Sequence, residues 1–231
     1  MSKYLNYVFF IPAFAGLTLV VDVMADNSAL TASQDGLQLV EKDRYSNFYA
    51  RPDIDWNVYT QVQLKDTPVA FRTDWQRNQN RSNPFKVDDK DMETIANSLS
   101  GQVRVFLTEA LSKNGGYAVN QASGPHVLVI KPAIVDLDVA APDTLKGAFS
   151  RQYTDSSTRM TLKLEFYDSV TGELLATSSD RLEDPRRGYL EWTTSGSNRA
   201  DSERLLRQWA AGLRQKLEEA RGKEPEANHS S

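Results

Sequence analysis

Cysteine is absent from the 231 residues, and histidine occurs only twice. No disulfide can therefore hold the fold, and the chain has neither a thiol nucleophile nor a cysteine for a lipid anchor. The two histidines are His126, at the start of a predicted strand, and His229, in the C-terminal tail. A Gly-x-Ser-x-Gly elbow and a Gly-rich phosphate loop are also lacking. The sequence therefore argues against Ser/His hydrolases, thiol enzymes and nucleotide enzymes, and we expect no cofactor.

An excess of basic residues is lacking too. The formal net charge is -4 at pH 7, and no stripe of Lys and Arg runs along the chain. Proteins that bind nucleic acid normally carry such a stripe or a basic domain. We therefore expect no nucleic-acid partner.

Long hydrophobic runs are confined to the N-terminus. Lys3 precedes an apolar run over residues 7–21, and Val23-Met24-Ala25 ends it with a small-residue cleavage site. We predict a signal peptide, cleavage before Asp26 and a periplasmic protein. The alternative is an uncleaved anchor in the inner membrane, because the stretch from Tyr4 to Ala25 is just long enough to span a bilayer core of about 30 Å. The predicted organisation is a signal peptide (1–25), a flexible leader (26–44), a single α/β domain (45–220) and a disordered tail (221–231).

Hydrophobic periodicity predicts the main elements of the domain. Apolar residues at intervals of three and four indicate a helix after Asp88, which can cap it, and a second helix over about 201–220. Strict alternation indicates strands over 56–64 and 159–167, the latter with Met160, Leu162, Leu164 and Phe166 facing inward. A turn at 168–172 joins the second strand to a returning one.

The order of these elements favours an α+β fold. Several strands lie between the two helices, and most are joined by hairpins rather than by crossover helices. Pro132 interrupts one predicted strand and implies an edge position or a bulge there. We predict a mostly antiparallel (mixed) sheet with the two long helices packed on one face.

Three segments carry a resemblance to a known family. They are Tyr49-Ala-Arg-Pro52-Asp53-Ile-Asp55-Trp-Asn-Val-Tyr59-Thr-Gln-Val62, Asp168-Ser-Val-Thr-Gly172-Glu-Leu-Leu and Gln208-Trp209-Ala210. The chain resembles an uncharacterised bacterial domain-of-unknown-function family of exported, often lipid-anchored envelope proteins. The resemblance implies an envelope location and brings no reaction with it. This chain departs from the lipoprotein members because no cysteine follows the signal segment.

Residues 65–87 form the least regular part of the sequence, and they contain the candidate partner-binding residues. Aromatic and basic side chains alternate there with amides, which suits contact with a glycan or a protein partner. The candidates are Phe71, Arg72, Trp75, Arg77 and Arg81. The alternative is that Phe71 and Trp75 pin this segment to the core. A weaker cluster of the same kind combines Arg186 and Arg187 with Tyr189 and Trp192.

Acidic residues offer a second kind of candidate site. Asp136 and Asp138 share one face of a predicted strand, and Asp143 follows, so the three carboxylates can converge on a divalent cation or act as an acid/base pair. The alternative is the solvated face of an amphipathic strand. Asp53 and Asp55 are interpreted as turn and cap residues.

The functional hypothesis drawn from these patterns is a non-enzymatic binding or assembly factor for another component of the cell envelope, a protein or a glycan. The alternative hypothesis is a small-ligand or metal-binding protein, or a hydrolase, with its site between sheet and helices. That alternative would use Asp136, Asp138 or His126.

Overall fold

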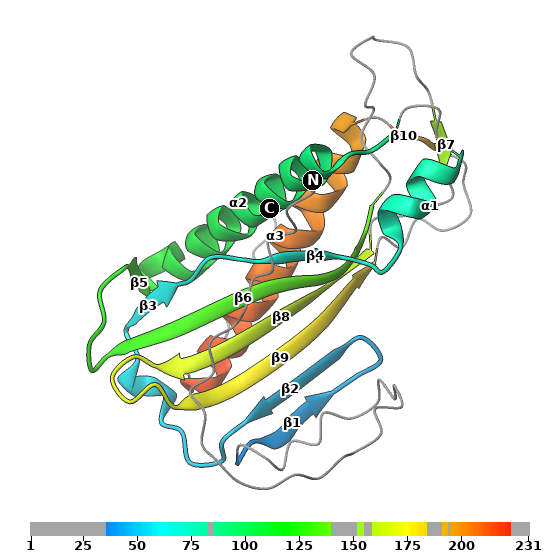
Figure 1. Cartoon of the computed structure of the whole chain (residues 1–231). Coiled ribbons are helices and arrows are strands. Elements are labelled where there is room, and N and C mark those ends of the chain that lie inside the picture. Colours follow the sequence, from blue (N-terminus) through cyan, green and yellow to red (C-terminus); the bar gives the residue numbers. More distant parts are fainter. Residues whose placement is uncertain are drawn as a thin grey trace, which may run out of the picture. The chain divides into compact units, whose positions relative to one another are not determined.

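The computed structural model describes residues 36–82, 86–139, 152–154, 159–183, 191–193 and 195–222. These residues form an eight-stranded sheet, a two-stranded sheet and three α-helices (Figure 1). The strands are β1 (Gln38–Lys42), β2 (Ser46–Ala50), β3 (Gln61–Leu64), β4 (Val69–Phe71), β5 (Ala118–Asn120), β6 (Val127–Asp138), β7 (Gln152–Thr154), β8 (Arg159–Asp168), β9 (Leu174–Glu183) and β10 (Glu191–Thr193). The helices are α1 (Trp75–Ser82), α2 (Asp89–Ser112) and α3 (Ser195–Ala220), with 3-10 turns η1 (Trp56–Val58) and η2 (Lys113–Gly115).

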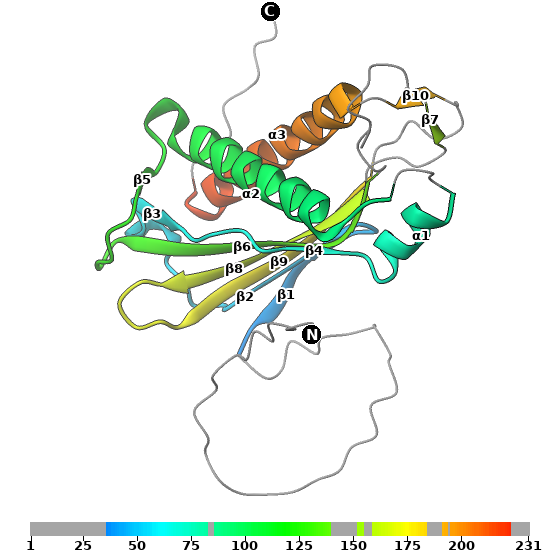
Figure 2. The same ribbon diagram turned by 45° about the horizontal axis from the view of Figure 1, so that its top comes forward.

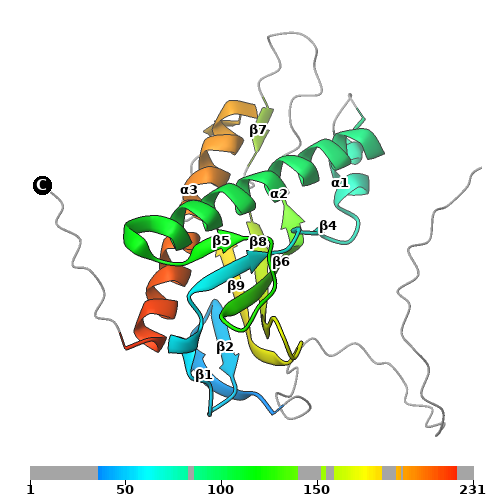
Figure 3. The ribbon, with the colours of Figure 1, turned by 90° about the vertical axis from the view of Figure 1, so that its left-hand side faces the viewer.

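The large sheet is open and mixed, with the order β1-β2-β9-β8-β6-β3-β5, and β4 also pairs with β6. The pairs from β1 to β6 in this order are antiparallel, whereas β3 and β4 run parallel to β6, and β5 runs parallel to β3. The predicted α+β class and the mostly antiparallel sheet are confirmed. Helices α2 and α3 contact each other and cross, as Figures 2 and 3 show.

The core follows the alternation of the central strands. In β8 the predicted inward residues Met160, Leu162, Leu164 and Phe166 are buried, and Lys163 between them is exposed. Buried residues of α2 and α3 join the same hydrophobic cluster. Since the chain has no disulfide, burial of this cluster is the main source of its stability.

The start of α2 matches the prediction. The Asp88 carboxylate accepts a hydrogen bond from the Asp91 backbone N–H at 2.9 Å, and the Asp91 carboxylate accepts one from the Asp88 N–H at 3.0 Å. This reciprocal capping box satisfies two backbone donors that would otherwise have no partner in the helix.

Replacing Asp88 with Ala is expected to lower the free energy of unfolding by about 1 kcal/mol, because the cap is lost. Urea denaturation followed by circular dichroism measures the change. Glu93→Ala, at an exposed position of the same helix, serves as the control and should change stability by less than about 0.5 kcal/mol. Equal effects of the two substitutions would contradict the assignment of the cap.

The prediction that residues 65–87 are irregular is wrong, because they contain β4 and α1. Helix α1 has Trp75 as its one bulky apolar residue, so no hydrophobic period marks it in the sequence. The contacts of Trp75 fix its position instead. The indole Nε1–H donates to the Val139 carbonyl at 2.9 Å, and the side chain is 1% exposed.

The strand predicted over residues 56–64 is shorter than expected. Its first part is the 3-10 turn η1, and only β3 is extended. The Asp55 carboxylate accepts a hydrogen bond from the Asn57 N–H at 3.0 Å, which stabilises the turn over a strand. The interpretation of Asp55 as a cap is therefore confirmed, while Val58 is exposed rather than inward.

Residues 38–42 lie inside the segment expected to be flexible, and they form β1, which pairs with β2. Every residue of β1 is exposed. The strand therefore carries no buried apolar face, and its backbone hydrogen bonds to β2 define it. A strand without a buried face shows no alternation of apolar and polar residues in its sequence.

Pro132 lies within β6, where the neighbouring strand changes. The carbonyl of Ile130 accepts from the Lys65 N–H at 2.9 Å, and the Ile134 N–H donates to the Pro68 carbonyl at 2.9 Å. Pro132 falls between these two bonds, opposite the connection from β3 to β4. A residue without an N–H is tolerated there, which explains how β6 continues through a proline.

Candidate functional site

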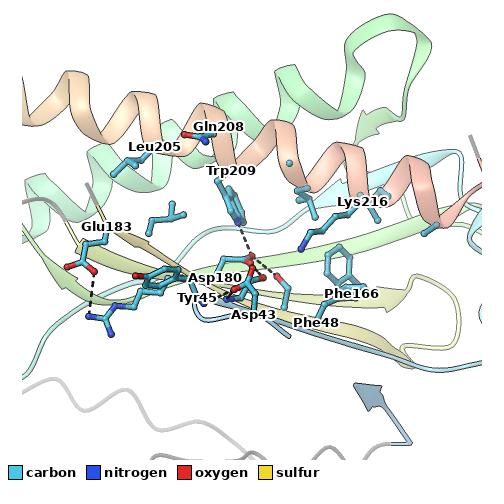
Figure 4. Close-up of a pocket in the computed structure, with 18 of the residues that line it drawn as sticks. Asp43, Tyr45, Phe48, Phe166, Asp180, Glu183, Leu205, Gln208, Trp209 and Lys216 are labelled. Atoms are coloured by element: carbon cyan, nitrogen blue, oxygen red, sulfur yellow. Dashed lines mark hydrogen bonds and ion pairs between the residues drawn. The ribbon is translucent and has the colours of Figure 1, made fainter. Parts of the chain in front are cut away.

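A cavity of about 570 Å³ opens between α3 and strands β2 and β9 (Figure 4). We call it the α3 groove. Its apolar lining comes from β2, β8, β9, η1 and α3, and its polar residues lie on β2, β9, α3 and the turn before β2. The residues that line it include Asp43, Tyr45, Ser46, Phe48, Trp56, Phe166, Ser178, Asp180, Arg181, Glu183, Trp209, Gly212 and Lys216.

Aromatic rings form one wall of the α3 groove. Phe166 of β8 packs edge to face against Phe48 of β2, with ring centroids 6.4 Å apart, and against Trp56 of η1 at 6.2 Å. Phe166 is fully buried and Trp56 is 8% exposed. The buried Phe166 ring therefore holds the Phe48 and Trp56 rings in place from the core side.

Asp180 of β9 lies at the polar centre of the groove. Its carboxylate accepts hydrogen bonds from the Trp209 indole N–H at 3.0 Å, from the Ser178 hydroxyl at 3.1 Å and from the Ser46 hydroxyl. These donors belong to α3, β9 and β2, so one carboxylate links the three elements that border the groove (Figure 4).

Charged residues of α3 and of the turn before β2 line the groove. Lys216 of α3 pairs with Glu41 of β1 at 2.9 Å. Asp43 accepts hydrogen bonds from the backbone N–H groups of Tyr45 and Ser46, each at 2.6 Å. These bonds hold the pKa of the Asp43 carboxyl below its usual value. The turn between β1 and β2 is therefore stabilised by an ionised aspartate.

Two of the candidate partner-binding residues, Phe71 of β4 and Trp75 of α1, pack toward the core. The rings of Phe71 and Trp75 stack with centroids 4.5 Å apart, and the Trp75 side chain is buried. The pinning role that the sequence left as an alternative is the one observed for this pair. Trp75 is not accessible to a partner.

The three arginines of the same candidate surface are exposed. Arg72 forms an ion pair with Asp138 at 3.3 Å, and Arg77 pairs with Asp74 at 2.9 Å. Arg81 lies one helical turn after Arg77, in the last turn of α1. Contact between these arginines and an envelope component stays a prediction.

Two of the carboxylates proposed as metal ligands, Asp136 and Asp138, lie in the described part of β6. Asp138 faces Arg72, whereas Asp136 is exposed and adopts a left-handed backbone conformation with φ 54°. Asp143 lies outside the described residues, as do Arg186, Arg187 and Tyr189. Within the described ranges, no group of three or more His, Asp and Glu side chains is arranged to hold a metal ion.

His126 is exposed and lies away from the α3 groove, with its Nδ1 2.9 Å from the Val58 carbonyl oxygen. The contact ties the start of β6 to η1.

Among the residues that the structure describes, none of the helices combines the length and apolar character needed to cross a membrane. The signal segment and its cleavage site lie outside these residues, so cleavage stays a prediction.

The fold and the groove define an α+β domain with a ligand-sized opening between one helix and an antiparallel part of the sheet. The chain belongs to the DUF3313 family, described as a protein of unknown function, which matches residues 26–213. This match confirms the resemblance to an uncharacterised bacterial family. No curated protein matches the chain.

Several solved structures of bacterial proteins are similar over most of their length. The PelC dodecamer from Paraburkholderia phytofirmans shares 10% identity, with 72% of this chain and 96% of that chain covered and a TM-score of 0.35. A DUF330 protein from Xanthomonas campestris shares 16% identity, covering 71% and 86%, with a TM-score of 0.37. A minor lipoprotein from Acinetobacter baumannii shares 14% identity, covering 70% and 95%, with a TM-score of 0.30.

Proposed function

We propose that this protein is a non-enzymatic binding protein of the bacterial cell envelope, exported to the periplasm, which holds an apolar ligand in the α3 groove. The observation that carries the proposal is the groove itself. Its volume of about 570 Å³ is typical of small-molecule sites, which are mostly apolar and contain a few placed polar groups. Aromatic walls beside the hydrogen-bonded carboxylate of Asp180 fit that description.

The proposal includes the arrangement of the long helices on one face of the sheet. Leu107 of α2, Leu206 of α3 and the inward residues of β8 belong to one hydrophobic cluster. In this arrangement α2 covers the half of the sheet that contains β4 and β5, which it contacts. Helix α3 then stands over β2 and β9, and the space between them is left for the ligand.

The alternative hypothesis, a ligand site between sheet and helices, agrees with this proposal in its location and differs in its residues. Asp136, Asp138 and His126 do not line the α3 groove. The groove instead presents Asp180, whose three donors hold it in one orientation. A straight alkyl chain suits such a site, because each methylene group removed from water contributes about 0.8 kcal/mol.

Gly212 of α3 provides a direct test, because it lines the groove and a Cβ placed there meets no atom within 4 Å. Gly212→Leu is expected to place its side chain in the groove and to weaken binding of 1-decanol at least tenfold. Isothermal titration calorimetry with the purified protein measures the affinity.

Gly101 of α2 is the matched control for this experiment. It is also a helical glycine with open space at its Cβ, and it does not line the groove. Gly101→Leu should leave the affinity for decanol unchanged. Both substitutions should raise the free energy of unfolding by about 0.5–1 kcal/mol, because glycine is a poor helix former. The proposal is wrong if wild type binds no decanol or if Gly212→Leu binds it as wild type does.

A further inference from the structure

We infer that the α3 groove selects an amphiphile with one alkyl chain and a protonated amine, and that Asp180 binds the amine. The inference rests on the proposed function, because it concerns the ligand of the same groove. It adds the charge of the ligand head and the side chain that recognises it.

Asp180 differs from other half-buried carboxylates of this chain in its partners. Asp138 is 15% exposed and pairs with Arg72, and Glu183 is 11% exposed and pairs with Arg159. Asp180 is held by two hydroxyls and one indole N–H, all of them neutral. In the part of the chain that the structure describes, no Lys or Arg forms an ion pair with it.

The Asp180 carboxylate can still accept hydrogen bonds from a cation. Two carboxylate oxygens offer about four acceptor positions, and three side-chain donors occupy part of them. An alkylammonium group can donate up to three hydrogen bonds, and a hydrogen bond between two ionised groups is about twice as strong as one between neutral groups. The partners of Asp180 fix its position and leave its charge uncompensated.

The lining of the groove favours a cation in two further ways. Three carboxylates (Asp43, Asp180 and Glu183) and two cations (Arg181 and Lys216) line it, so the walls carry one net negative charge. Aromatic rings of Tyr45, Phe48 and Trp209 also border it, and the face of such a ring attracts an organic cation. An anionic head of the same size would meet repulsion from Asp180.

The volume of the groove decides between a small amphiphile and a larger partner. At about 570 Å³ it falls in the range of small-molecule sites. An interface that holds a folded protein buries about 800 Å² on each partner, which needs a much wider surface. A single alkyl chain with a small head is therefore the occupant that the groove fits.

Titrations with three ligands of equal chain length test this inference: decylamine, 1-decanol and decanoate, each below its micellar concentration. Calorimetry at pH 7 should show that the amine binds about tenfold more tightly than the alcohol, since its bond to Asp180 is charge-assisted. Decanoate should bind most weakly. Equal affinity for all three would overturn the inference and leave the proposed function standing, whereas no binding of any of them would overturn both.

Asp180→Asn assigns the selectivity to this residue. The amide retains an oxygen acceptor for Trp209 and removes the charge, so the preference for decylamine over 1-decanol should fall from about tenfold to about equal. Asp138→Asn removes a carboxylate charge outside the groove and should keep the preference. An Asp180→Asn protein that remains folded and retains the amine preference would show that another group recognises the head.

Discussion

Replacing Trp75 with Ala is expected to lower the free energy of unfolding by about 3–5 kcal/mol, the range found for large buried aromatic residues. The side chain is 1% exposed, it stacks on Phe71, and its indole N–H donates to the Val139 carbonyl at 2.9 Å. The substitution removes all of these contacts and leaves a cavity beneath α1. Urea denaturation followed by circular dichroism measures the loss.

Trp75→Phe separates the hydrogen bond from the packing. It retains a ring against Phe71 and leaves the Val139 carbonyl without its donor, which should cost about 1–3 kcal/mol. Its effect should therefore be smaller than that of Trp75→Ala. A Trp75→Ala protein as stable as wild type would place this side chain at the surface and return it to the predicted contact surface on residues 71–81.

The second large effect is expected at the centre of the sheet. Phe166→Ala should lower the free energy of unfolding by about 3–5 kcal/mol, because a fully buried ring is lost from the core. Its edge-to-face contacts with Phe48 and Trp56 are lost as well. The loss also removes the support behind the aromatic wall of the α3 groove, so ligand binding should weaken together with stability.

Tyr167→Ala is the matched control, since it removes the neighbouring aromatic side chain from the opposite face of β8. Tyr167 is only partly buried, and its ring lies under the Lys131 ammonium at 3.9 Å. Loss of this cation–π contact at an exposed site should cost about 0.5–1 kcal/mol. Similar losses at Phe166 and Tyr167 in urea denaturation would contradict the assignment of the buried face.

Much of the fold was predictable from the sequence, since it depends on local patterns. The alternation of Met160 to Phe166 predicted the inward face of β8, and Asp88 predicted the first residues of α2. Gly172 was expected to allow the turn between β8 and β9, and it has φ 70°. Each of these features is set by residues close together in the chain, which is why periodicity and capping rules found them.

The elements that escaped prediction lack a hydrophobic period. Helix α1 has a single apolar anchor, Trp75, whose hydrogen-bond partner Val139 lies 64 residues away. Strand β1 is exposed along its whole length and depends on pairing with β2. Tertiary contacts define both elements, and one sequence does not display such contacts.

The α3 groove escaped prediction for the same reason. Ser46, Asp180 and Trp209 are far apart in the sequence, and the pairing of β2 with β9 and the position of α3 bring them together. Trp209 was expected in the apolar ladder of the last helix, and it is indeed 8% exposed. The only local signal was its indole N–H, which needs a polar partner when buried.

The most direct test of ligand binding in the α3 groove is the indole N–H resonance of Trp209 in ¹⁵N-labelled protein during a titration with 1-decanol. Trp209 lines the groove and bonds to Asp180, whereas Trp75 is buried elsewhere and bonds to Val139. We expect a saturable shift of the Trp209 resonance and no shift of the Trp75 resonance. An unchanged Trp209 resonance, or equal shifts of both, would contradict binding in the groove.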